Sequence, residues 1–272
     1  MSDTIPNSQA DALPSPEQLL KTAISAASAA SAYAMKNRGR RHDANSVARN
    51  DIKLKLDVEC QEIATRTILC DFPTHFILGE EDKEERSSPE DSVEWIIDPI
   101  DGTVNFFHGA PYWCCSVAAR INGKTMAGCV CAPEMGLVFQ ASRGTPSLRN
   151  GERIRVSDTA SADRSIIHTG ADKSASPESC PFRFMDKIAS VAQRPRIYGA
   201  AALDICMVAC GAADAFFEPG IYIWDIAAAD LILEEAGGRG TIMRNLGHHR
   251  LAYLGSNGRI HDEITAELEP MF

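Results

Sequence analysis

The spacing of apolar and polar residues divides the chain into two halves of different character. In the first half, alanine-rich periodicity predicts a helix over residues 16–36, and a second helix is predicted over residues 55–70. Pro16 directly after Ser15 is typical of the first turn of a helix. Short apolar runs bounded by turn residues predict strands at 75–79, 93–97, 114–121, 128–131 and 136–142, and one more after the Asn150-Gly turn. The turns between the later strands favour an antiparallel meander.

Beyond residue 157, strand-like and helix-like segments alternate. The predicted strands are 165–169, 196–198 and 213–218, and the predicted helices are 181–192, 201–210, 225–236 and a terminal helix after Asp262. This alternation is typical of an α/β arrangement. We therefore expect an α+β half over residues 16–156 joined to an α/β half over residues 157–272. Residues 1–15 are polar and contain proline, so a mobile tail is expected there.

The composition is that of a soluble globular protein, because 44% of the 272 residues are hydrophobic and 24% are charged. The formal net charge of −10 repels nucleic acid and anionic membranes, so neither is expected as the principal partner. The first residues carry no basic segment followed by an apolar one, which predicts no secretory signal. No apolar run is long enough to span a bilayer. The predicted location is therefore the cytoplasm.

The chain contains nine cysteines, an odd number, and most of them lie inside apolar runs. This placement predicts reduced core residues rather than a disulfide framework. The pair Cys129 and Cys131 raises the alternative of a zinc site, but no matching Cys or His pair follows at the spacing of a zinc finger.

The segment WIIDPIDGTVNFFHG at residues 95–109 places two carboxylates where an apolar strand leaves the core. Pro99 has no amide hydrogen to give to a strand ladder, so the strand is predicted to end near Asp98. Gly102 allows a tight turn, and Thr103 is predicted to begin a short helix. The simplest explanation of Asp98 and Asp101 is that they cap this turn.

Other acidic residues weaken that explanation. Glu80 follows an apolar strand, Asp225 precedes an alanine-rich helix, and Asp57 follows the alternating run Asp51-Ile-Lys-Leu-Lys-Leu. Carboxylates that meet in a folded protein repel one another unless cations neutralise them. Oxygen ligands without histidine or thiolate favour Mg²⁺ over zinc. A pair of Mg²⁺ ions would also explain how an acidic protein binds a phosphate substrate.

Three motifs in the same order resemble those of the inositol monophosphatase family, whose members are magnesium-dependent, lithium-sensitive phosphatases. The motifs are Gly79-Glu-Glu, WIIDPIDGTVNF, and the segment ADAFFEPGIYIWDIAAA at residues 213–229 with the following Glu-Ala-Gly-Gly. The similarity extends from about Pro16 to the C-terminus. It implies the layered αβαβα sandwich of the inositol monophosphatase and fructose-1,6-bisphosphatase type, and a homodimer.

The resemblance also implies a set of metal ligands. Glu80, Asp98 and the carbonyl of Ile100 match the residues that hold the first Mg²⁺. Asp98, Asp101 and Asp225 match those that hold the second, and a third, weaker ion would use Glu80 with waters.

The resemblance implies further roles at the reacting phosphate and the leaving group. Asp57 and Thr103 match the pair that orients and deprotonates the attacking water, and the amides of Gly102 and Thr103 match those that cradle the phosphate. Glu218 and Ala201 match the positions that bind ring hydroxyls. The alternatives are that Glu218 is a solvent-exposed carboxylate at a strand end and that Ala201 only packs in a helix.

The expected function is therefore Mg²⁺-dependent hydrolysis of myo-inositol monophosphate, within a substrate class of small phosphorylated polyols and sugars. The same chemistry on fructose 1,6-bisphosphate, histidinol phosphate or 3′-phosphoadenosine phosphate is the nearest alternative. A different class is also open, because some bacterial relatives act by binding the transcription machinery. In that case the basic segment Arg38–Arg41 would mark a partner surface.

Overall fold

The structure is a computed structural model that describes residues 13–47, 52–82, 88–171, 180 and 182–272. The predicted mobile tail lies outside the described residues, apart from residues 13–15. Helix α1 begins directly after that segment. Ser15 caps it by accepting a hydrogen bond from the Gln18 amide, and Pro16 occupies its first turn, as the sequence predicted.

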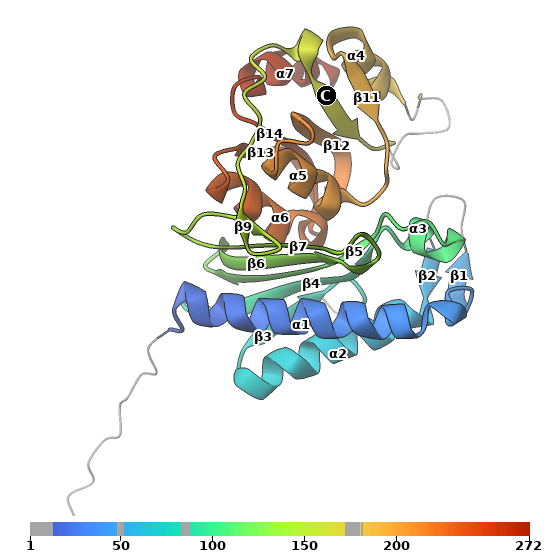
Figure 1. The fold of residues 1–272 in the computed structure, drawn as a ribbon, viewed down its shortest axis with the longest axis vertical. Helices are drawn as coiled ribbons and strands as arrows, with labels where there is room; N and C mark the ends of the chain where they lie inside the picture. Colours follow the sequence, from blue (N-terminus) through green and yellow to red (C-terminus); the bar gives the residue numbers. More distant parts are fainter. Residues whose placement is uncertain (1–12, 48–51, 83–87, 172–179, 181) are drawn as a thin grey trace, which may run out of the picture.

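The chain folds into a layered αβαβα sandwich, as predicted (Figure 1). Helices α1 and α2 cover the outer side of the larger sheet, α5 and α6 lie between the two sheets, and α4 and α7 cover the far side of the smaller sheet. The helices are α1 (Pro16–Lys36), α2 (Lys55–Asp71), α3 (Thr103–His108), α4 (Arg183–Val191), α5 (Ala201–Ala209), α6 (Ile223–Glu235) and α7 (His261–Leu268).

The larger sheet has seven strands in the order β3-β4-β5-β6-β7-β8-β9. Their bounds are β3 (Phe76–Gly79), β4 (Val93–Asp101), β5 (Cys114–Ile121), β6 (Lys124–Ala132), β7 (Leu137–Ser142), β8 (Leu148–Arg149) and β9 (Glu152–Arg153). Strands β5, β6 and β7 form the predicted antiparallel meander. Strand β3 pairs parallel to β4, so the carboxyl ends of these two strands lie at the same edge of the sheet.

The smaller sheet has the order β11-β10-β12-β14-β13. Its strands are β10 (Ile166–Thr169), β11 (Arg194–Arg196), β12 (Ala215–Tyr222), β13 (Arg239–Gly247) and β14 (Arg250–Ser256). The first three are parallel, and β12, β14 and β13 are antiparallel. The hairpin of β13 and β14 was not predicted, and it makes this sheet mixed rather than purely of the α/β type.

Two other expectations about strands need correction, and one hairpin was not expected. Strand β4 continues to Asp101 instead of ending near Asp98, because Pro99 lies in an irregularity of the ladder between the Asp98 and Asp101 pairs, where no donor is required. Strand β11 covers 194–196 rather than 196–198. A small hairpin of β1 (Ala44–Val47) and β2 (Ile52–Leu54) precedes α2 and was not predicted.

Small residues allow the central helices to approach the larger sheet closely. A Cβ atom added at Gly128 on β6 would lie 2.9 Å from the Cα of Ala228 on α6. The alanines Ala227, Ala228 and Ala229 are all buried in the core that the two sheets share with α5 and α6. This close packing holds the N-terminus of α6, which carries Asp225, near the end of β4.

All nine cysteines lie within the described residues and carry free thiols, and most of them are buried, as expected for reduced core residues. No helix in the described part of the chain is long and apolar enough to cross a bilayer.

Candidate metal and phosphate site

The parallel pairing of β3 and β4 brings two of the predicted ligands together. Gly79 lies opposite Ile97 in the ladder, so Glu80 and Asp98 occupy the next positions on adjacent strands. The Glu80 amide donates to the Ile97 carbonyl at 3.1 Å and extends the pairing by one residue. The carboxylates of Glu80 and Asp98, which are 18 residues apart in the sequence, therefore lie side by side at this edge of the sheet.

Asp98, Asp101 and Asp225 form a compact group. Each offers a carboxylate oxygen, and these atoms all lie within 4.8 Å of one another. Asp98 and Asp101 are only 1% and 6% exposed. Asp225 lies in the first turn of α6, where its carboxylate accepts a hydrogen bond from the Tyr222 amide at 2.7 Å.

Burial and mutual repulsion disfavour the charged form of these carboxylates. Burial raises the pKa of Asp98 well above its ordinary value, and the charges of Glu80 and Asp101 raise it further. Burial also raises the pKa of Asp101 to about 7, with a contribution from Asp225. The pKa of Glu80 is raised by burial and by the charges of Asp225 and Asp57. Such a group stays ionised only where cations compensate it, and its all-oxygen donors suit Mg²⁺.

The orientation of Asp101 is set by helix α5. Its two carboxylate oxygens accept hydrogen bonds from the amides of Ala201 at 3.0 Å and Ala202 at 2.7 Å. The Cys114 thiol donates to one of the same oxygens at 3.4 Å. Sequence reasoning missed all three bonds, and the two from α5 join residues about 100 positions apart in the chain. The Ala201 amide is already engaged by Asp101, and the hydroxyl-binding role of Ala201 stays a prediction.

The turn between β4 and α3 is held by local hydrogen bonds. The Ile100 amide donates to Asp98 at 3.1 Å, and the Thr103 hydroxyl donates to the Ile100 carbonyl at 2.9 Å. Gly102 has a φ of +91°, and a Cβ atom there would lie 3.1 Å from both the Tyr112 carbonyl oxygen and Ala200 Cβ. Only glycine fits this left-handed and crowded position without strain.

Asp57 lies in the first turn of α2. It is 3% exposed, and one of its oxygens accepts a hydrogen bond from the Leu54 amide at 2.8 Å. Its charge contributes to the raised pKa of Glu80. The predicted joint action of Asp57 and Thr103 on a water stays a prediction.

Two residues that sequence reasoning missed hold the turn that carries Glu80. The Gln61 side chain donates to Asp82 at 2.8 Å and accepts from the Glu81 amide at 2.9 Å. Asp82 also accepts from the Gly79 amide at 2.8 Å. Asp82 has a recognisable signal, because aspartate commonly accepts from backbone amides in turns, whereas nothing in the sequence pattern indicates Gln61.

Glu218 lies on β12, outside the carboxylate group. It sits at an irregularity of the β12 and β14 ladder and directly against Gly170, the residue that follows β10. Ala201 begins α5 between the two sheets, with 8% of its surface exposed. The structure therefore places Glu218 and Ala201 on different elements from the carboxylates of Asp98 and Asp225.

A model of the inositol monophosphatase family matches residues 15–269. The chain belongs to this family. It is 34% identical over 258 residues to the Nus factor SuhB of Pasteurella multocida, covering 93% of this chain and 96% of that protein. It is 37% identical over 192 residues to an inositol monophosphatase of Dictyostelium discoideum, covering 69% of this chain and 71% of that protein. The solved structure of an Anabaena inositol monophosphatase is 31% identical, with a TM-score of 0.81 over 93% of this chain and 96% of that one.

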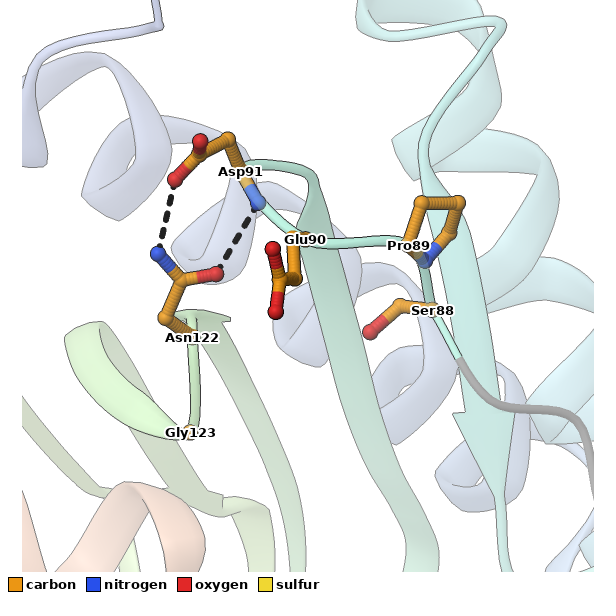
Figure 2. Close-up of a pocket in the computed structure, with 6 residues that line it drawn as sticks. All are labelled: Ser88, Pro89, Glu90, Asp91, Asn122 and Gly123. Carbon is orange, nitrogen blue, oxygen red and sulfur yellow. Dashed lines mark hydrogen bonds between the residues drawn. The ribbon is translucent and has the colours of Figure 1, made fainter.

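A hollow lies at the start of β4, at the other end of this strand from the carboxylate group, and the described residues that line it include no comparable group of carboxylates. It is lined by residues 88–91 and by Asn122 and Gly123, where β4 begins and β5 ends (Figure 2). Asn122 accepts from the Asp91 amide at 2.9 Å and donates to the Asp91 carboxylate at 2.8 Å. This reciprocal pair closes the end of the sheet, so we interpret the hollow as a structural feature.

Proposed function

We propose that the protein is a Mg²⁺-dependent phosphomonoesterase that hydrolyses myo-inositol monophosphate to inositol and phosphate. Membership of the inositol monophosphatase family supports the reaction class. The observation that carries the proposal is the convergence of Asp98, Asp101 and Asp225 within 4.8 Å. A group of three carboxylates, two of them buried at the end of β4 and one half-buried at the start of α6, is difficult to explain as a set of turn caps, because its repulsion opposes folding.

In this proposal Glu80, Asp98, Asp101, Asp225 and the Ile100 carbonyl hold the metal. Bound Mg²⁺ would neutralise the phosphate oxygens and the leaving alkoxide and lower the pKa of water. The donor set fits this ion, because every proposed ligand atom is an oxygen and the carboxylates come from rigid strand and helix ends.

The remaining roles belong to groups around the metal ligands. Asp57 and Thr103 orient the attacking water, the Asp57 carboxylate accepts its proton, and the amides of Gly102 and Thr103 hold the phosphate. Glu218 and a backbone group at Ala201 bind hydroxyls of the polyol. Water attacks phosphorus in line with the departing oxygen, and no phosphorylated protein side chain forms.

Phosphate release from inositol 1-phosphate tests the reaction. We expect turnover with Mg²⁺, loss of nearly all of it in Asp98→Asn, and wild-type turnover in the matched control Asp158→Asn, whose side chain is 64% exposed and pairs with Arg155. Turnover that persists in excess EDTA would contradict the proposal.

A substrate panel tests the choice of ester. We expect inositol 1-phosphate to have the highest kcat/KM among itself, fructose 1,6-bisphosphate, histidinol phosphate and 3′-phosphoadenosine phosphate. If one of the others ranks far above it, the substrate assignment is wrong while the Mg²⁺ chemistry stands. In this proposal the ranking depends on how well Glu218 and its surroundings bind the polyol or sugar that carries the phosphate.

A partner-binding role is a second candidate, favoured by the name Nus factor SuhB of several relatives. Arg38 and Arg40 lie in the predicted basic segment, but Arg40 already forms a bidentate ion pair with Glu59 at 2.9 and 2.7 Å. Affinity pulldown with Asp98→Asn and with Arg38→Ala separates the roles. A scaffold role predicts that the metal-site variant keeps its partners and the arginine variant loses them.

The expected assembly is a homodimer, which the family resemblance implies, and the expected location is the cytoplasm. Light scattering of the purified protein, giving twice the 29.5 kDa mass of one chain, is the result that we expect.

A further inference from the structure

A chain of polar side chains, two buried and one half-buried, lies beside the helix that contacts the carboxylate group, and the proposed reaction gives it no role. The Tyr112 hydroxyl donates to Asp204 at 2.7 Å, and the His168 ring nitrogen Nδ1 lies 2.7 Å from the same carboxylate oxygen. Asp204 and His168 are only 1% and 4% exposed. Burial raises the pKa of Asp204, and the hydrogen bonds from His168 and Tyr112 oppose that rise.

These three residues come from three different elements. Asp204 lies in α5, one turn after the helix begins. Tyr112 belongs to the segment between α3 and β5 of the larger sheet, and His168 lies in β10 of the smaller sheet. One carboxylate therefore ties α5 to both sheets of the sandwich.

The same helix holds a proposed metal ligand. The amides of Ala201 and Ala202 are the first two of α5, and they donate to the two oxygens of Asp101. Because Asp204 lies on the helix that carries these amides, a shift or rotation of α5 moves the donors that orient Asp101. The Asp204 amide donates to the Ala200 carbonyl at 2.9 Å in the first turn of α5. This helical bond holds Asp204 in a fixed position relative to the Ala201 and Ala202 amides.

Aromatic and amide contacts extend this arrangement toward the phosphate turn. The Tyr198 ring, just before α5, packs on the Tyr112 ring at 4.8 Å and on the His168 ring at 4.9 Å. The Asn105 side chain of α3 donates to the carbonyls of Tyr112 at 2.7 Å and Tyr198 at 2.8 Å. The segments that enclose Gly102 are thus joined to Tyr112, which is half-buried, and through it to the buried Asp204 and His168.

Buried charged and polar pairs contribute little net stability compared with apolar packing of the same volume, but they fix geometry when every member has a partner. Metal ligands demand such geometry, and the groups that hold a ligand in place affect metal affinity strongly. A positional role therefore explains these groups better than a role in overall stability.

We propose that Tyr112, Asp204 and His168 are positioning residues that hold α5 so that its first two amides orient Asp101 for metal binding. This inference rests on the proposed function, since it assumes that Asp101 is a metal ligand. It assigns none of the three residues a contact with substrate.

The test measures Mg²⁺ affinity directly, by calorimetry on the whole protein without substrate, together with the Mg²⁺ dependence of turnover. Tyr112→Phe removes one hydroxyl and its bond to Asp204. The matched control is Thr22→Val, which removes a hydroxyl that donates to the Asp71 carboxylate at 2.6 Å between α1 and the far end of α2. We expect Tyr112→Phe to weaken Mg²⁺ binding about tenfold and Thr22→Val to leave it unchanged at a similar loss of Tm.

Substitution of His168 supplies a second, independent measurement. His168→Ala should weaken Mg²⁺ binding like Tyr112→Phe, and His168→Asn should largely restore it, because the amide places a donor near the position of Nδ1. Equal Mg²⁺ affinity in wild type, Tyr112→Phe and His168→Ala would overturn the positioning role while leaving the proposed function intact. A wild-type protein that binds no Mg²⁺ at millimolar concentration would remove the proposed function itself, and this inference with it.

Discussion

The Glu218 carboxylate lies directly against Gly170, so that a Cβ atom added at Gly170 would be 2.6 Å from the Glu218 carboxyl carbon. In the parallel pairing of β10 with β12, Thr169 lies opposite Phe217. Gly170 and Glu218 are the next residues after this pair. Successive residues of a strand point to opposite faces of the sheet, so His168 and Gly170 lie on the same face. The absence of a side chain at residue 170 therefore leaves the space that the Glu218 carboxylate occupies.

Substitution Gly170→Ala should displace that carboxylate and weaken binding of the polyol. Loss of one hydrogen bond to a substrate hydroxyl corresponds to about a three- to tenfold increase in KM, with kcat little changed because the metal ligands stay in place. Gly39→Ala is the matched control, since a Cβ atom there meets nothing within 4 Å. An unchanged KM in Gly170→Ala, alongside wild-type folding, would argue against a substrate-binding role for Glu218.

The turn after β3 offers a second test, because Gln61 connects it to α2. Gln61→Leu removes the bonds to Asp82 and to the Glu81 amide, so Glu80 should lose its fixed orientation. We expect the Mg²⁺ concentration for half-maximal activity to rise about tenfold. Thr67→Val on the same helix removes only a local bond to the Ile63 carbonyl and should leave this concentration unchanged. A shift of equal size in both variants would indicate a general effect of α2 instead.

The sequence alone was sufficient to predict the layered fold and to select the acidic residues. Each of Glu80, Asp98 and Asp225 stands at the end of an apolar strand or the start of an apolar helix, where a carboxylate has no place in the core. Parallel pairing of β3 with β4 then brings the first two together. The motif order identified the family, which supplied the layer arrangement that local patterns do not contain.

The missed features depend on tertiary contacts. Strand β13 buries only Met243 along its length, so it shows no alternation of apolar and polar residues that would reveal a strand. The extension of β4 past Pro99 is permitted only by an irregularity in its pairing with β5. The bonds from the start of α5 to Asp101 cross about 100 residues of sequence, and no local pattern encodes them.

Binding of Mg²⁺ should raise the thermal stability of the protein. At a Mg²⁺ concentration of 100 times Kd, binding to the folded state adds about 2.7 kcal/mol, which corresponds to an increase in Tm of roughly 5–10 °C for a chain of this size. Asp98→Asn should abolish most of this increase and, without metal, should melt above the wild type, because the amide avoids the cost of placing a carboxyl group where burial and neighbouring charges disfavour its ionised form. The measurement is thermal denaturation in EDTA and in Mg²⁺ at matched ionic strength. Equal Tm values for the wild type in both buffers would contradict a Mg²⁺ site.

A buried histidine far from the site predicts how stability depends on pH. His261 begins α7 and is 1% exposed, with Thr241 at 2.9 Å from Nε2 and Ser256 at 2.8 Å from Nδ1. Burial, together with the charge of Arg239, lowers the pKa of His261 to about 4. The unfolded chain, with an ordinary histidine pKa of about 6.5, therefore binds a proton that the folded protein excludes between these two values.

Protonation of the unfolded state lowers the free energy of unfolding as the pH falls from about 6.5 toward 4. The variant His261→Gln lacks this group, and all other titrating residues are common to both proteins. We expect the stability of the wild type relative to His261→Gln to fall by about 2 kcal/mol between pH 7 and pH 4.5, measured by urea denaturation at each pH. A difference between the two proteins that stays constant over this range would show that His261 takes up its proton in the folded state, and the polar contacts to Thr241 and Ser256 would then have to be assigned to the imidazolium form.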